Sequence, residues 1–73
     1  MAVYCRQTAE GEPDQEYVIE PHRPDQADWE LMIAKANGAA DKGWMVEWDD
    51  PLRFTATKIR WSGVTCTRTF EVR

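Results

Sequence analysis

The sequence predicts an α+β fold in which one helix packs on one face of an antiparallel sheet, with the elements in the order β-β-α-β-β-β. A helical spacing of apolar residues runs from Asp25 to Gly43, and an alternation of period two replaces it from Trp44 onward. Turn-forming residues separate the expected strands. The 73 residues make one small domain over residues 1–73, and four tryptophans can supply the apolar area that its core needs.

Two short strands are expected before the helix, over residues 2–7 and 17–20. Residues 8–16 (TAEGEPDQE) contain Gly11, Pro13 and several acids, which favours a mobile, acidic loop between the strands. Two interpretations of its charge stay open. The acids are either solvated, or they form a surface that imitates nucleic-acid phosphate or docks on a basic protein.

The helix is expected to begin with Asp25 as its N-cap. Its buried stripe is expected to contain Trp29, Ile33, Ala36 and Ala40, at the spacing i, i+4, i+7, i+11, with Met32 and Ala39 beside them. The dipeptide Asn37-Gly38 is a weak point, because glycine inside a helix costs about 1 kcal/mol relative to alanine. The helix therefore either ends there or continues to Gly43, a natural C-cap.

Three strands are expected after the helix, over residues 44–48, 53–61 and 64–72. The first turn between them, at residues 49–52, contains a proline, which is favoured in turns. The second turn is expected to contain only Ser62 and Gly63, a two-residue hairpin connection. The C-terminal half of the chain therefore forms a three-stranded meander.

These turns also predict which residues share a face of the sheet, because directly paired residues lie on the same side. They place Trp48 opposite Arg53 and Trp61 opposite Val64. The face covered by the helix is then expected to contain Trp44, Val46, Trp48, Ile59, Trp61, Val64, Cys66, Phe70 and Val72. The opposite face is expected to contain Met45, Glu47, Phe54, Ala56, Lys58, Arg60, Thr65, Thr67, Thr69 and Glu71. Arg68 is expected to point inward, either stacked on the indole of Trp44 or displaced by a bulge.

The charge and hydropathy pattern argues against several classes of protein. The net charge is -4, with -5 over residues 1–43 and +1 over residues 44–73, which argues against general binding of duplex DNA. No apolar run approaches the roughly 20 residues of a membrane span, and the N-terminal residues MAVYCRQTAE lack the apolar region of a signal peptide. We therefore expect a cytoplasmic protein without a membrane partner, in which Cys5 and Cys66 are reduced thiols.

No residue pattern typical of a catalytic or metal site stands out, so neither enzyme activity nor a cofactor is expected. A structural zinc site requires four ligands, usually in close-spaced pairs, but Cys5 and Cys66 are far apart and His22 is the one histidine. Neither thiol has a helix N-terminus or a neighbouring base in the sequence to activate it. Both cysteines are expected to be buried, and a disulfide between them requires adjacent strands and an oxidising environment.

The first candidate binding surface is an apolar patch at one end of the outer sheet face. Met45, Leu52 and Phe54 are expected to cluster there, beside charged residues. Exposed apolar side chains in such a setting are typical of a modest protein-binding patch. The alternative is that the N-terminal segment covers and buries them.

The second candidate surface is basic and lies on the same face. Lys58 and Arg60 are expected beside the hydroxyls of Thr65 and Thr67. Cationic and hydroxyl side chains contact phosphate, so this surface favours nucleic acid. The alternative is an ordinary solvated sheet face, in which threonine is common because β-branched residues suit strands.

The junction Lys42-Gly43-Trp44, followed by MVEW, resembles the layout of several small virus-encoded inhibitor proteins and several uncharacterised bacterial domains, in which a helix ending in Gly-Trp also precedes a meander. No functional residue follows from this resemblance, since a C-cap and a core aromatic explain the Gly-Trp pair. The sequence thus favours a non-catalytic protein-binding module with an unidentified partner, of the virus-encoded inhibitor type. A nucleic-acid-binding module and a structural homo-oligomer, such as a homodimer, are the alternatives.

Overall fold

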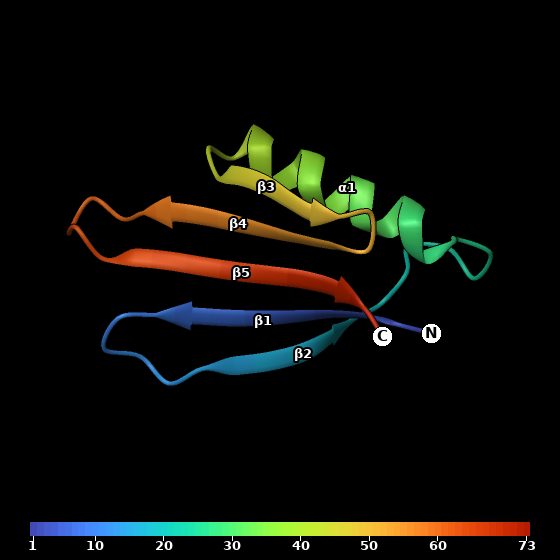
Figure 1. Ribbon diagram of the computed structural model, residues 1–73, viewed down its shortest axis with the longest axis horizontal. Helices are drawn as coiled ribbons and strands as arrows, with labels where there is room; N and C mark the ends of the chain where they lie inside the picture. Colours follow the sequence, from blue (N-terminus) through green and yellow to red (C-terminus); the bar gives the residue numbers. More distant parts are fainter.

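The computed structural model describes residues 1–73 and contains one helix and five strands. The elements are β1 (Val3–Ala9), β2 (Gln15–Ile19), α1 (Asp28–Asp41), β3 (Met45–Asp50), β4 (Arg53–Ile59) and β5 (Thr65–Val72). The strands form one antiparallel sheet in the order β2-β1-β5-β4-β3. The predicted fold class and element order are therefore confirmed. Helix α1 lies over the β3–β4 side of the sheet, and β2 is the one strand it does not contact (Figure 1).

The N-terminal hairpin is longer than predicted, because the expected loop at residues 8–16 is wrong at both ends. Strand β1 continues to Ala9 and β2 begins at Gln15, so only residues 10–14 connect them. Gly11 supplies the left-handed backbone conformation of the turn, with φ of 80°. The acids of this region pair with arginines of the neighbouring strands and of the β4–β5 loop, which offsets the repulsion that favoured a loop.

The turn between β3 and β4 differs from the prediction by one residue. A bulge between Trp48 and Asp50 places Phe54, rather than Arg53, opposite Trp48. The side chain of Asp50 accepts a hydrogen bond of 2.7 Å from the backbone N–H of Leu52, which closes a tighter turn than expected.

The loop between β4 and β5 is one residue longer than the predicted two-residue turn. The backbone N–H of Arg60 donates to the carbonyl of Val64 at 2.8 Å, so residues 61–63 form a three-residue loop. Gly63 has φ of 89°, as the last residue of such a loop requires. As a result Lys58, rather than Ile59, lies opposite Cys66.

Both one-residue shifts act on β4, so this strand is inverted relative to the prediction while β3 and β5 keep their predicted faces. Phe54 and Ala56, expected on the outer face, are fully buried. Ile59, expected in the core, is 67% exposed, and Trp61 is fully exposed in the β4–β5 loop. Phe54 stacks on Phe70 with their ring centroids 4.7 Å apart, at the centre of the core.

The buried stripe of the helix overlaps the predicted one only in part. Met32 and Ala36 are buried as predicted, together with Leu31, whereas Trp29 and Ile33 are 60% and 46% exposed. Alanine and the flexible Met32 permit close approach of helix and sheet, and the bulky Trp29 and Ile33 lie at the flank of the contact instead. The sequence did not distinguish these stripes, because both are apolar at helical spacing.

The ends of the helix set up the candidate site. The predicted N-cap Asp25 is wrong, because the helix begins at Asp28 and Gln26 instead accepts a hydrogen bond from the backbone of His22. At the other end the helix continues through Gly38, and the N–H of Trp44 donates to the carbonyl of Ala39 at 3.0 Å. Gly43, directly before Trp44, has φ of 88°. The helix therefore has a Schellman ending, which brings Trp44 back against the last turn of α1.

This helix is not long and apolar enough to cross a membrane.

Candidate functional site

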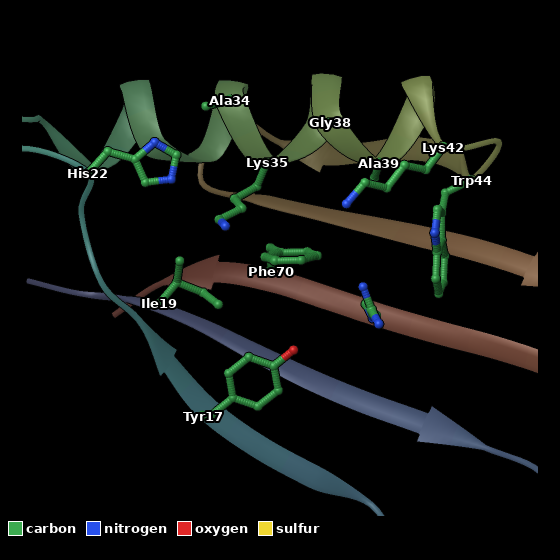
Figure 2. A pocket seen from close by; sticks show the side chains of 11 residues that line it. Tyr17, Ile19, His22, Ala34, Lys35, Gly38, Ala39, Lys42, Trp44 and Phe70 are labelled. Carbon is green, nitrogen blue, oxygen red and sulfur yellow. The ribbon is translucent and has the colours of Figure 1, made fainter.

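A groove of about 380 Å³ lies between α1 and the half of the sheet that the helix leaves uncovered. Its lining residues are Tyr17, Ile19, His22, Ala34, Lys35, Gly38, Ala39, Lys42, Trp44, Arg68 and Phe70. We call this feature the cationic groove. Figure 2 shows Lys35 and Lys42 reaching from α1 towards the sheet, with His22 at one end and Trp44 at the other. The groove exists because β1 separates β2 from β5, so that Tyr17 and Ile19 of β2 stand beyond the reach of the helix.

Trp44 and Arg68 separate this groove from a second, smaller hollow. The guanidinium carbon of Arg68 lies 4.6 Å from the centroid of the Trp44 ring, and Lys58 Nζ lies 5.9 Å from it. The hollow has a volume of about 240 Å³ and is lined by Gln7, Trp44, Lys58, Arg60, Cys66 and Arg68. We call it the Arg68 hollow. Of the two alternatives for Arg68, the contact with the indole of Trp44 is the one observed.

Four cations that line the groove or the hollow differ from the other cations of the chain in having no acidic partner. The sequence contains nine lysines and arginines. Five arginines form ion pairs, namely Arg6, Arg23, Arg53, Arg60 and Arg73. The other four, Lys35, Lys42, Lys58 and Arg68, line the groove or the hollow, and no Asp or Glu lines either one. An acidic protein thus concentrates its unpaired positive charge in one place.

A buried thiol lies beside Tyr17, which lines the groove. Cys5 is fully buried and lies opposite Tyr17 in the β1–β2 pairing. Burial raises the pKa of the Cys5 thiol, although the Tyr17 hydroxyl and the positive charges of Arg68 and Lys35 act in the opposite direction. The hydrogen bond with Cys5 is also the largest cause of the raised pKa of Tyr17.

Both cysteines are expected to resist thiol reagents in the native protein. The raised pKa keeps Cys5 protonated at neutral pH, and Cys5 and Cys66 are both free and buried. Labelling with a chromogenic disulfide reagent should therefore be slow under native conditions and fast in denaturant. Rapid labelling of the folded protein would instead indicate a reactive thiol. The raised pKa of Cys5 also makes the free energy of unfolding depend on pH. Its contribution is fully present below the pKa of cysteine in the unfolded chain, and it is lost as pH rises through the higher pKa of the folded protein.

The predicted apolar patch does not exist as one surface. Met45 is 74% exposed on the sheet face away from the helix, and Leu52 is exposed in the β3–β4 turn. Phe54 is fully buried in the core under α1, because the bulge in β3 inverts the facing of β4. The expectation that Phe54 is available to a partner is wrong.

The predicted basic face is also divided between the two sides of the sheet. Thr65 and Thr67 stay on the face away from the helix, opposite Ile59 and Thr57. Lys58 lies on the helix side, where its Nζ donates to the carbonyl of Lys42 at 3.2 Å. Arg60 lines the Arg68 hollow and pairs with Glu12 at 2.9 Å. The two cations therefore belong with Arg68 and not with the threonines.

Three of the exposed large apolar side chains, those of Trp29, Ile33 and Trp48, lie together on the other flank of α1. With Pro51 they line a shallow apolar groove beside the edge strand β3. Asp49 and Asp50 directly follow Trp48 in this strand. This groove is separated from the cationic groove by the helix itself.

No group of three or more His, Cys, Asp or Glu side chains lies close enough together to hold a metal ion. The polar groups that do converge are cations and donors, which bind anions rather than metal ions. In comparisons with known proteins, no protein-family model, curated protein or solved structure matched this chain.

Proposed function

We propose that the protein is a non-catalytic binding module that holds a short acidic segment of another protein in the cationic groove. The observation that carries this proposal is that Lys35, Lys42, Lys58 and Arg68, all without acidic partners, line the cationic groove and the adjoining Arg68 hollow. Elsewhere on the chain arginines pair with acids of the same chain. Carboxylates of a partner would supply what these four cations lack.

The apolar lining of the groove points to a peptide rather than to an isolated ion. Ile19, Ala34, Ala39 and Phe70 share the groove with the cations. Ligand sites generally combine an apolar lining with a few polar groups that fix orientation. A segment that alternates acidic and apolar side chains would therefore use both parts of the lining.

Single-stranded nucleic acid is a weaker fit to the same surface, because stacking of bases requires free aromatic faces. Phe70 is buried, and the ring of Trp44 already carries the guanidinium of Arg68. A long polyanion leaving the hollow at Arg60 would also meet Glu12 and the other acids of the β1–β2 turn. These features favour a short anionic segment.

Removing two groove lysines should weaken binding of an acidic peptide by at least about tenfold, since each contact with a charged partner contributes on the order of 1 kcal/mol or more. The test compares the native protein with the Lys35→Gln/Lys42→Gln variant, using a short peptide of glutamate and leucine and isothermal titration calorimetry. Raising the salt concentration should weaken binding to the native protein steeply.

The matched control is Arg6→Gln/Arg53→Gln, which removes the same charge from the opposite face of the sheet. This control should bind the peptide nearly as the native protein does. Equal losses in both variants would show that net charge alone governs binding and would overturn the proposed groove. If the protein bound a single-stranded oligonucleotide more tightly than the peptide, the proposed partner would be nucleic acid and not protein.

A further inference from the structure

We propose that the Arg68 hollow is a subsite for a phosphorylated side chain of the bound segment. This inference rests on the proposed function and names the group that one end of the groove recognises. The residues that carry it are Arg68 and Lys58, which both line the hollow and lie over the ring of Trp44.

The charge of the subsite exceeds what one carboxylate can balance. Arg68 and Lys58 both approach one indole ring, and Lys58 Nζ donates only to the backbone carbonyl of Lys42. Neither Arg68 nor Lys58 has an acidic partner in the chain. One carboxylate carries a single charge and leaves one of these two cations uncompensated. A phosphoryl group carries about -1.5 to -2 at neutral pH and offers three acceptor oxygens.

A second feature of the subsite is the state of the Arg68 guanidinium. Its Nε is buried and has no hydrogen-bond partner in the protein. A buried donor without an acceptor costs about 1–3 kcal/mol, and such groups are uncommon in native folds. Stacking on Trp44 holds the planar group in a fixed orientation, and a fixed guanidinium suits phosphate oxygens.

A third feature is the size and the lining of the hollow. Its volume of about 240 Å³ is adequate for a phosphoryl group but is smaller than typical sites for whole organic ligands, which begin near 300 Å³. Gln7 adds a neutral donor, while Arg60 is already occupied by Glu12. The remaining titratable group is Cys66, which is buried. No carboxylate lines the hollow and repels an anion.

The experiment compares two peptides that differ only in one residue, phosphoserine or glutamate, within the same glutamate–leucine sequence. We expect the phosphopeptide to bind about tenfold or more tightly at neutral pH, because charge-assisted bonds to phosphate outnumber those to a carboxylate. The Lys58→Gln variant should lose this preference. The Lys35→Gln variant, altered in the groove but outside the hollow, should weaken both peptides and keep the preference.

A pH titration provides a second readout that a merely structural role of Lys58 would not change. The preference for phosphoserine should fall as pH drops through about 6, the second pKa of the phosphoryl group. The titration is run in a His22→Gln background, which removes the one imidazole that lines the groove. The charged groups that face the phosphoryl group are Arg68, Lys58 and Arg60, and the Cys66 thiol lies beside them.

The outcomes separate the two proposals. If both peptides bind equally well, or if Lys58→Gln weakens them by the same factor, the phosphoryl subsite is wrong while binding of acidic segments stands. If neither peptide binds, both proposals fall. Thermal unfolding of each variant confirms that the protein compared is folded.

Discussion

Replacing Phe54 with alanine should destabilise the protein by about 3–5 kcal/mol, the usual range for a buried phenylalanine. Phe54 is fully buried, and its ring centroid lies 4.7 Å from that of Phe70, on which it stacks, and 4.8 Å from that of Trp48. A domain of this size has a total stability on the order of 5 kcal/mol. Much of the variant should therefore be unfolded at room temperature, as urea titration followed by tryptophan fluorescence would show.

Ile59 provides the matched control on the same strand. Its side chain is 67% exposed on the opposite face, so Ile59→Ala should change the free energy of unfolding by less than about 0.5 kcal/mol. The register predicted from the turns alone requires the reverse result, with Ile59 in the core and Phe54 on the surface. A larger loss from Ile59→Ala than from Phe54→Ala would therefore show that the register of β4 is not the one described.

The inversion of β4 explains which parts of the fold the sequence could predict. The helix, the meander and the faces of β3 and β5 follow from hydrophobic period and turn residues. The facing of β4 depends on two turn lengths, and each differed from expectation by one residue, at the bulge before Asp50 and in the loop ending at Gly63. A shift of one residue moves every side chain of a strand to the other face. Two such shifts cancel for β5 and leave β4 alone inverted.

The candidate site was predicted only in part, for a related reason. Arg68 was expected to point inward, with the contact to Trp44 as one of two alternatives, because both residues share a face under either register of β4. The contributions of Tyr17 and His22 depend on the position of β2 at the edge of the sheet, beyond β1 and β5. Strand order is a tertiary property that local pattern does not encode. Lys35 reaches the groove because the helix turns Leu31 and Met32, rather than Trp29 and Ile33, towards the sheet.

Replacing Arg68 with methionine should abolish most binding of the acidic peptide while leaving stability within about 1 kcal/mol of the native value. Methionine fills the space on the Trp44 ring and removes the buried Nε that has no partner, which offsets about 1–3 kcal/mol. The lost cation–π contact costs about 0.5–2 kcal/mol in the other direction. Affinity, by contrast, should fall at least about tenfold, because the only arginine in the site without an acidic partner is gone.

The two measurements on this variant separate a binding role of Arg68 from a structural one. Chemical denaturation gives the free energy of unfolding, and calorimetry gives the peptide affinity. A structural arginine would show the opposite pattern, with a loss of several kcal/mol in stability and little change in the affinity of the fraction that stays folded. Arg53→Met, which removes a paired arginine from the other face of the sheet, supplies the baseline for both quantities. If the free energy of unfolding is unchanged or higher without Arg68 while the peptide affinity falls, the side chain serves binding. A side chain that served stability would lower the free energy of unfolding when it is removed.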